Sequence, residues 1–350
     1  MFSGILLYKL IIAVAVFAVS LLVAAYATYG ERKVAAFFQD RIGPNRAGPF
    51  GLLQPIADGV KMIMKEEFIP GAANKWLFIL GPCIAMFVAN MTGVVIPWAR
   101  PIKIDKEVFT FQITDINIGI LWVFGVVSMG VYGIMIGGWA SNNKYSLLGT
   151  LRASSQMISY ELAMGLSLVA LIMTTGTLNV NEIVEQQDKG LCNFCYQPLG
   201  FIIFMICAFA ETNRAPFDLP ETETELVGGY HTEYSSMKLG FYLFSEYINM
   251  FISSAVMASL YFGGYHFPFE NEIMAYTGES LMRIIGAGVF LGKIIGFIFF
   301  FMWIRWTLPR FRYDQLMNLG WKTLLPLSIA NLVITGIVIA VKEGWFNRFF

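Results

Sequence analysis

The amino-acid sequence predicts an all-α integral membrane protein with about eight transmembrane helices and one further helix at the membrane surface. The chain of 350 residues is 57% hydrophobic and only 14% charged, with a mean hydropathy of +0.62. An ordinary soluble domain is about 25% charged. The apolar residues also gather in eight windows that are long enough, or nearly so, to cross a hydrocarbon core about 30 Å thick.

These eight windows are expected to be helices, because a bilayer offers no hydrogen-bond partners to an open backbone. A barrel would instead show segments of about ten residues with alternating hydrophobicity. We assign residues 1–350 to a single transmembrane domain. The first window is not followed by a small-residue cleavage site, so it is expected to be a retained span. The predicted spans cover residues 5–29, 76–97, 117–139, 156–176, 198–212, 239–264, 284–304 and 324–341.

The fifth window, residues 198–212, is the shortest. Pro198 lies at one end, and the polar run Glu211-Thr212-Asn213-Arg214 follows at the other. A broken or tilted helix is therefore expected here.

Residues 51–68, GLLQPIADGVKMIMKEEF, have apolar side chains at helical spacing. This pattern is typical of an amphipathic helix that lies at the membrane interface. The pattern alone does not separate a simple surface anchor from a functional element. The apolar positions are Leu52, Leu53, Ile56, Val60, Ile63 and Met64.

Lysines and arginines predict the orientation of the bundle, because positively charged connectors are retained in the cytoplasm. Connectors 30–75, 140–155, 211–238 and 305–323 contain 15 of the 24 lysines and arginines, and the connectors on the other side contain seven. Both termini are therefore expected on the non-cytoplasmic side of a bacterial inner membrane, with an organelle membrane as the alternative. The charge-rich cytoplasmic connectors are the expected place for partners and chemistry.

A few ionisable side chains lie inside the predicted spans, where each costs at least about 2.5 kcal/mol. Glu161 and Glu246 lie a few residues into the fourth and sixth spans, and Glu211 closes the fifth. At about 1.5 Å per residue, all three are expected within about 12 Å of the cytoplasmic helix ends, a common depth that suits a proton path. Snorkelling or a structural hydrogen bond is the alternative. Lys293, near the middle of the seventh span, joins these candidates.

The connector at residues 211–238 is strongly acidic. Carboxylates this dense repel one another, which raises some of their pKa values and favours shared protons. A solvated acidic loop is the ordinary alternative, but the interspersed apolar residues Pro216, Phe217, Leu219 and Leu226 indicate a loop that packs on another surface. Besides Glu211, the acidic residues are Asp218, Glu221, Glu223, Glu225 and Glu233.

Several functions are disfavoured by composition and motifs. Lysine plus arginine equals aspartate plus glutamate, at 24 each, so no overall field favours nucleic acid. No glycine-rich loop opens a strand–helix unit of the dinucleotide type, so this chain is not expected to bind NADH itself. His231 and His266 are predicted on opposite faces of the membrane, which argues against a zinc set or a histidine triad.

The cysteines do not predict a metal site. Cys83 and Cys207 fall inside apolar windows, whereas Cys192 and Cys195 form one C-x-x-C pair in a short connector. An iron–sulfur cluster or a structural zinc ion needs about four ligands. The pair therefore stays open between a disulfide and two inert thiols.

Four long segments make the chain similar to a known family. In this order, and over nearly the whole chain, they resemble the H subunit of respiratory complex I, the proton-pumping NADH:quinone oxidoreductase, and its mitochondrial counterpart. Membrane subunits of energy-conserving hydrogenases are more distant relatives. The segments are ERKVAAFFQDRIGPNRAGPFGLLQPIADGVK (31–61), ISYEL (158–162), FAETNRAPFDLPETETELVGGYHTEYSSMKLGFYLFSEY (209–247) and RWTLPRFRYDQLMNLGWKTLLP (305–326).

The resemblance implies a subunit that forms the membrane end of a quinone tunnel, beneath a hydrophilic arm, and that is catalytic only within its assembly. FMN, the iron–sulfur clusters and the residues that clasp the quinone head group are implied in partner subunits, so this chain alone is expected to bind no cofactor. An arginine in the tunnel could neutralise charge as quinone is reduced, or simply pair with nearby carboxylates. The tunnel positions carry over to Glu31, Arg32, Gln39, Arg41, Arg46, Ala57, Asp58, Lys61, Arg214 and Phe217.

The carboxylates that the family links to proton transfer include Glu161, Glu211 and Glu246, which are also expected at a common depth. The third span, 117–139, departs from some relatives because it holds no carboxylate, so a relay through that position is not implied here. The Cys192/Cys195 pair is not a family signature. The relay positions carry over to Glu161, Glu211, Glu221, Glu223, Glu225 and Glu246.

Two other classes of function are weighed against this one. An independent proton-coupled transporter would also place carboxylates in spans, but it should show a midplane substrate site and an internal repeat. Neither is visible in the sequence. A structural anchor for a soluble hydrogenase would leave the tunnel residues without a role.

Overall fold

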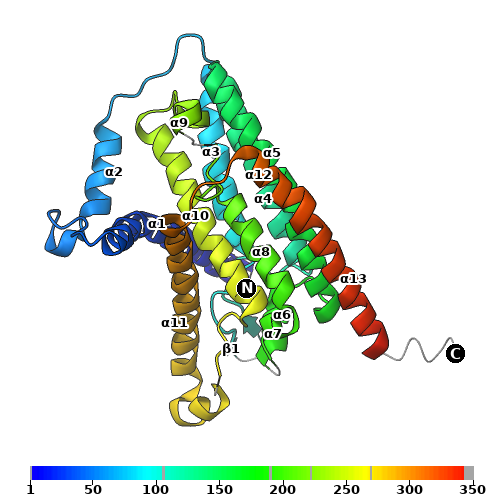
Figure 1. Cartoon of the computed structure of the whole chain (residues 1–350). Helices are drawn as coiled ribbons and strands as arrows, with labels where there is room; N and C mark the ends of the chain where they lie inside the picture. The colour runs from blue at the N-terminus through cyan, green and yellow to red at the C-terminus, as the bar shows by residue number, and fades with distance from the viewer. Residues whose placement is uncertain (1, 105–106, 189–190, 221–222, 269, 343–350) are drawn as a thin grey trace.

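The computed structural model describes residues 2–104, 107–188, 191–220, 223–268 and 270–342, and it shows a bundle of helices (Figure 1). The extended structure within these residues is one antiparallel pair, β1 (Ile102–Ile104) and β2 (Glu107–Phe109). Helices make up nearly all of the regular structure. The predicted all-α membrane fold is therefore confirmed.

Seven helical segments in the described residues are long and apolar enough to cross a bilayer. The last of them is continuous, since the short helix α12 (Tyr313–Asn318) and a π-helical segment (Leu319–Leu324) lead directly into α13. The helix α11 bends at Gly278, which has a positive φ of 74°. The seven segments are built on α1 (Phe2–Phe38), α3 (Lys75–Thr92), α4 (Gly119–Ala140), α5 (Lys144–Thr175), α10 (Ser236–Tyr261), α11 (Glu270–Thr307) and α13 (Leu325–Lys342).

The helix at the fifth predicted window is α8 (Pro198–Glu211), which has only 14 residues. At 1.5 Å per residue it is about 21 Å long, shorter than a hydrocarbon core of about 30 Å. Pro198 occupies the first turn, where its missing N–H costs nothing. Asn213 follows the helix with a positive φ of 50° and turns the chain. One short helix therefore occupies the window in which a broken or tilted helix was expected.

The remaining helices are short and lie in the connectors. They are α2 (Gln54–Met64), α6 (Val180–Asp188), α7 (Asn193–Tyr196) and α9 (Glu223–Leu226), with 3₁₀ turns at Pro49–Gly51, Gly93–Val95 and Gly229–His231.

The connectors gather at two opposite ends of the bundle (Figure 1). The link from α2 to α3, α9 and the start of α5 lie at one end, and β1, α6, α7 and the link from α10 to α11 lie at the other. The first end carries the basic connectors on which the predicted orientation is based. The helix α1 is steeply inclined to α11, and α13 lies alongside α5 at the edge of the bundle.

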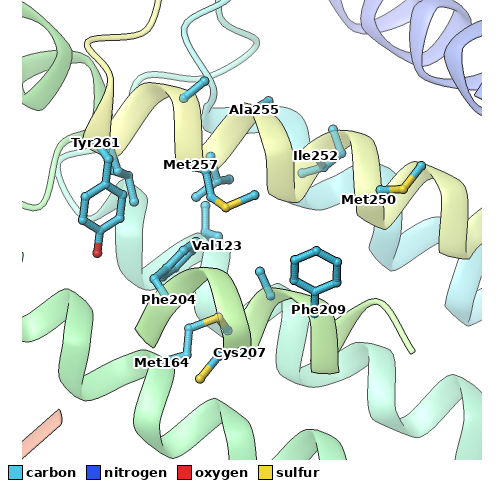
Figure 2. Packing of buried hydrophobic residues seen from close by; sticks show 14 of the residues in the cluster. Val123, Met164, Phe204, Cys207, Phe209, Met250, Ile252, Ala255, Met257 and Tyr261 are labelled. Atoms are coloured by element: carbon cyan, nitrogen blue, oxygen red, sulfur yellow. The ribbon is translucent and has the colours of Figure 1, made fainter. Parts of the chain in front are cut away.

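The core lies where α8 and α10 face each other. Figure 2 shows Phe204 and Cys207 of α8 on one side and Ile252 and Met257 of α10 on the other, with Met164 of α5 below them. All five side chains are buried. By contrast, many apolar side chains of α1, α4, α11 and α13 are exposed, as expected for helices whose outer faces contact lipid.

Small residues let α3 and α4 approach closely. A Cβ atom at Gly133 would lie 2.9 Å from the backbone nitrogen of Ala85, and one at Gly81 would lie 2.8 Å from the Cα of Gly137. Such backbone-to-backbone contact is a common way for helices to associate where lipid removes the hydrophobic driving force. The α3–α4 pair is thus a rigid support beside the site described next.

The helix α2 packs against α1 and α10, and none of its residues is buried. Its apolar side chains Ile56, Val60, Ile63 and Met64 are all more than half exposed. Residues 51–68 are thus only partly helical, and the helix turns an apolar stripe away from the bundle.

Candidate functional site

A buried arginine joins two of the predicted groups of site residues. Arg214 lies in the turn after α8, and its Nη1 donates to Glu31 Oε2 of α1 at 2.9 Å. Its Nη2 lies 3.8 Å from Glu246 Oε2 of α10. The three residues are only 5%, 6% and 7% exposed. The structure therefore places a tunnel candidate, Glu31, and a relay candidate, Glu246, on either side of one guanidinium.

The environment of Arg214 keeps this guanidinium charged. Burial by itself would lower its pKa, but the neighbouring Tyr247, Glu31 and Glu246 raise the pKa of Arg214 above its ordinary value. The guanidinium also lies over the ring of Tyr247, 3.9 Å from the ring centroid. The buried cation and the two carboxylates stabilise one another, because each charge is costly to bury without an opposite charge nearby.

Three side chains of this centre were not selected from the sequence. Arg305 of α11 forms an ion pair with Glu31 Oε1, and the Tyr247 hydroxyl donates to Glu31 Oε2 at 2.7 Å. The Tyr230 hydroxyl donates to Glu246 Oε1 at 3.0 Å. All three lie within the segments that carry the family resemblance. Their amino-acid identities alone do not predict these contacts, because the partners are not neighbours in the chain.

A cavity connects two of the predicted carboxylates. Glu246 and Glu211 both line it, and its volume of about 80 Å³ leaves room for several waters. Its walls are mostly apolar and come from α3, α4, α5, α8 and α10. The other polar side chains that line it are Thr92, Thr212, Asn213, Tyr230, Tyr242, Ser245, Asn249 and Ser253.

Glu161 extends this line of carboxylates beyond the cavity. It lies on α5 and interacts electrostatically with Glu211. The Ser128 hydroxyl of α4 donates to Glu161 Oε1. The third predicted span, which has no carboxylate, thus contributes a hydroxyl group at this point. Glu161, Glu211 and Glu246 are brought into one neighbourhood, in keeping with their predicted common depth.

A second part of the predicted tunnel lies where α1 meets α2. Arg32 Nη1 and Asp58 Oδ2 form an ion pair at 2.8 Å, and Gln54 Nε2 donates to Asp58 Oδ1 at 3.2 Å. The Arg32 side chain is half exposed, so this pair is much more open to its surroundings than Arg214. Five further tunnel candidates are exposed around the same helices: Gln39, Arg41, Arg46, Ala57 and Lys61.

Phe217 lies elsewhere, in the buried core. Its ring packs edge-on against Tyr160 of α5 and also contacts Phe311. Its backbone carbonyl accepts a hydrogen bond from Gln156 Nε2 at 2.9 Å. The described contacts of Phe217 are therefore those of a residue that anchors the acidic connector.

The acidic connector is packed and partly neutralised. Leu219 and Leu226 are buried, as the apolar residues in this connector indicated. Glu225 pairs with Arg152 at 2.5 Å, and Asp218 pairs with Arg310 at 2.7 Å. Each of these two carboxylates is therefore paired with an arginine.

The connector has three other carboxylates, of which the structure describes the side chain of one. Glu233 accepts a hydrogen bond from Asn143 Nδ2 at 2.6 Å. Glu223 begins α9, but its side chain lies outside the part of the chain that the structure describes. Glu221 lies wholly outside the described residues.

Lys293, the remaining candidate inside a predicted span, contacts backbone carbonyls beyond the end of α10. Its Nζ donates to the backbone carbonyls of Phe262, Gly264 and His266 at 2.7, 2.7 and 2.5 Å. These carbonyls follow the end of α10, at least sixteen residues beyond Glu246, which is about 24 Å along a helix. Carbonyls past a helix end lack partners in the helix, and the ammonium group satisfies three of them.

His266 also takes part in a cluster that the sequence did not predict. Its Nδ1 lies 2.7 Å from Glu270 Oε2 and 3.5 Å from Asp188 Oδ1, and the three potential ligand atoms lie within 4.8 Å of one another. Arg100 Nη1 pairs with the other oxygen of Glu270 at 2.7 Å. One histidine with two carboxylates is an incomplete zinc set, and the adjacent arginine disfavours a cation. The cluster is therefore best described as an ion-pair network.

Comparison with known sequences identifies the family. The sequence model of the NADH dehydrogenase family matches residues 10–336. The chain is 66% identical to an H subunit of the NADH-quinone oxidoreductase of Cytophaga hutchinsonii, over 95% of this chain and 96% of that protein. It is 58% identical to the H subunit of the NADH-quinone oxidoreductase of Flavobacterium johnsoniae, over 96% of each chain.

A more distant relative gives the same result. The chain is 46% identical to NADH-quinone oxidoreductase subunit 8 of Rhodothermus marinus, over 96% of this chain and 98% of that protein. The matches extend over nearly the whole chain, including α1, the turn after α8 and α10, which carry the buried centre. The chain therefore belongs to the NADH dehydrogenase family, in which these relatives are subunits of NADH-quinone oxidoreductases.

Proposed function

We propose that this chain is the membrane subunit of a proton-translocating NADH-quinone oxidoreductase, that it forms the access path for quinone, and that it couples quinone reduction to proton movement. The names of the relatives support the first part. One observation carries the coupling: Arg214 lies between Glu31 and Glu246, and Glu246 in turn lines a cavity with room for several waters that Glu211 also lines.

The coupling is electrostatic. A unit charge placed about 8 Å from a carboxylate, at an effective dielectric constant near 20, changes the energy of the ionised carboxylate by about 2 kcal/mol. This corresponds to a change of about 1.5 in its pKa. Reduction of quinone brings negative charge, and the Glu31 side of Arg214 is the side that faces the proposed tunnel. Any shift of the guanidinium toward Glu31 weakens its hold on Glu246, which then binds a proton more readily.

Glu211 and Glu161 would pass the change in the protonation of Glu246 on into the membrane domain. Glu246 and Glu211 share one cavity, and Glu211 interacts with Glu161. Water in the cavity would bridge the first two groups. Hydrogen-bonded neighbours on α4 and on the acidic connector, such as Ser128 and Tyr230, would set the geometry of the relay.

The quinone path would run past α1 and α2. The exposed apolar stripe of α2 suits contact with lipid or with a lipid-soluble substrate, and the Arg32–Asp58 ion pair fixes α2 on α1. Arg41, Arg46 and Lys61 would add positive charge at the entrance. Under this proposal FMN and the iron–sulfur clusters belong to partner subunits, and this chain alone binds no cofactor.

The orientation follows from the charge of the connectors. The end that carries α9 and the α2–α3 link would face the cytoplasm and bear the hydrophilic arm, in a bacterial inner membrane. Both termini would then lie on the outer side. Adjacent membrane subunits would cover other exposed apolar faces.

Substitution of Arg214 tests the proposal. In the assembled complex, Arg214→Lys keeps the charge but cannot contact both carboxylates with a planar fork, so NADH:quinone reductase activity should fall about tenfold or more. The activity of Arg214→Met should fall further, because this variant removes the buried cation that lies between Glu31 and Glu246. NADH oxidation by a hydrophilic artificial acceptor should stay within about twofold of wild type per assembled complex.

Arg312→Met is the matched control, because the Arg312 side chain is 77% exposed and forms its ion pair with the exposed Asp314. It should leave both activities unchanged. Wild-type quinone reductase activity in the Arg214 variants, or an equal loss of both activities in assembled enzyme, would contradict the proposed function.

A further inference from the structure

The C-x-x-C pair lies in a single backbone turn. Cys192 immediately precedes α7, and the backbone N–H of Cys195 donates to the Cys192 carbonyl at 2.9 Å. A turn closed by such an i to i+3 bond holds its end Cα atoms within about 7 Å. A disulfide spans about 4.4–6.8 Å between Cα atoms. The backbone therefore already holds the two cysteines at a distance that suits a disulfide.

Neighbouring residues fix this turn on the end of α10. Asn193 Nδ2 donates to the Leu260 carbonyl at 2.8 Å, and the Asn193 backbone N–H donates to Gln187 Oε1 at 3.1 Å. The ring of Phe194 stacks on Phe262, with centroids 5.3 Å apart. Since the turn is ordered in advance, bond formation would cost little further conformational entropy.

The two cysteines differ in how accessible they are to solvent and reagents. Cys195 is exposed and Cys192 is half-buried, whereas Cys207 is fully buried in the core. The Lys293 side chain interacts electrostatically with Cys192. No other pair of cysteines in the described residues shares a turn.

The proposed location of the C-x-x-C pair favours oxidation of its two thiols. The helix α7 lies at the end of the bundle that carries β1 and α6, opposite the basic connectors (Figure 1). Under the orientation proposed above, on which this inference rests, that end faces the outer compartment. Disulfides persist there and are rare in the cytoplasm.

We propose that Cys192 and Cys195 form a disulfide in the mature protein, a covalent modification that closes the α7 turn. The Cys195 thiolate attacks an external disulfide, of the kind carried by thiol–disulfide exchange proteins, and releases one external thiol. The Cys192 thiolate then attacks the Cys195 sulfur of the mixed disulfide and expels the second external thiol. Two protein thiols are thereby oxidised, and one external disulfide is reduced to two thiols, with the two protons taken up by the released thiolates.

Thiol counting on the wild-type chain tests this directly. Cells are quenched in acid, the protein is denatured, and free thiols are alkylated with a maleimide–polyethylene glycol reagent before or after reduction. We expect two additions before reduction, at Cys83 and Cys207, and four after it. Four additions before reduction would overturn the proposal.

Single substitutions assign the pairing. Cys83→Ser is the matched control and should give one addition before reduction and three after, so the gain of two remains. Cys192→Ser and Cys195→Ser should each abolish that gain of two. Persistence of the gain in either of them would overturn the pairing.

A membrane-impermeant phosphine separates this proposal from the proposed function. In right-side-out spheroplasts it should reduce the pair, giving four additions. Reduction by permeant dithiothreitol alone would place the pair on the cytoplasmic side and overturn its oxidation in the outer compartment. These readouts do not depend on quinone reductase activity, so either proposal can fail without the other.

Discussion

At the scale of single residues, the buried centre depends on Glu31 having more than one partner. Its two carboxylate oxygens are shared among Arg214, Arg305 and the Tyr247 hydroxyl. A carboxylate at 6% exposure needs such partners, because a buried charge without hydrogen bonds costs several kcal/mol. Tyr247 also supports Arg214 with its ring, so one side chain positions both members of the Glu31–Arg214 pair.

Tyr247→Phe separates the two roles of this tyrosine. The ring stays beneath Arg214, and the polar contacts of the hydroxyl, chiefly its hydrogen bond to Glu31, are lost. A hydrogen bond to a charged group contributes about 1.5–3 kcal/mol. We expect NADH:quinone reductase activity to fall about tenfold while the complex assembles normally and still reduces an artificial acceptor. Tyr145→Phe, at a half-exposed position of α5, is the control and should have no effect. Unchanged quinone reduction in Tyr247→Phe would show that Glu31 does not need this hydroxyl.

At the scale of elements, the site is held by helices that approach closely. The cavity wall includes Ala85 and Val88 of α3 and Gly130 and Ile134 of α4, so the spacing of α3 and α4 sets part of its shape. That spacing is possible because glycines face the partner helix. The helix α4 also packs against α5, where the Ser128 hydroxyl donates to Glu161.

Gly133→Leu tests this packing. The new side chain would start 2.9 Å from the backbone of Ala85, and overpacking of this kind typically costs about 1–3 kcal/mol. We expect a lower yield of assembled complex on native gels and a lower temperature of inactivation. Gly125→Leu, on the same helix, has no neighbour within 4 Å of the new Cβ and should behave as wild type. Equal behaviour of the two variants would mean that α3–α4 contact does not limit assembly.

At the scale of the whole molecule, the sequence predicted the membrane fold well because apolar length is visible locally. It underestimated three helices: α1, α5 and α11 extend about nine to fourteen residues beyond the predicted windows. Those extensions carry polar residues such as Arg32, Lys144 and Glu272, which end a hydropathy window without ending a helix. Helix boundaries at the membrane surface are set by capping and tertiary contacts, which hydropathy does not report.

The candidate site was only partly predictable. The depth of a residue follows from its place along a span, which is why Glu161, Glu211 and Glu246 could be grouped. The direction in which a side chain points does not follow from depth, and for this reason the sequence did not indicate that Lys293 contacts backbone carbonyls beyond the end of α10. The contact between Glu31 and Arg214 joins residues 183 positions apart, and no local pattern encodes such a pairing.

The central claim is that Glu246, Glu211 and Glu161 form one relay that Arg214 couples to quinone reduction. The most direct test measures NADH:quinone reductase activity and proton pumping together in assembled complexes that carry Glu246→Gln, Glu211→Gln or Glu161→Gln. Glutamine keeps the shape and much of the hydrogen-bonding capacity but cannot take up or release a proton. Glu185→Gln, at an exposed position of α6, is the matched control.

We expect the relay variants to lose quinone reductase activity and pumping together, by about tenfold or more, because coupling makes turnover depend on proton movement. Electron transfer to an artificial acceptor should persist, and Glu185→Gln should match wild type. Wild-type turnover with normal pumping in all three relay variants would contradict the account and would assign these glutamates a structural role.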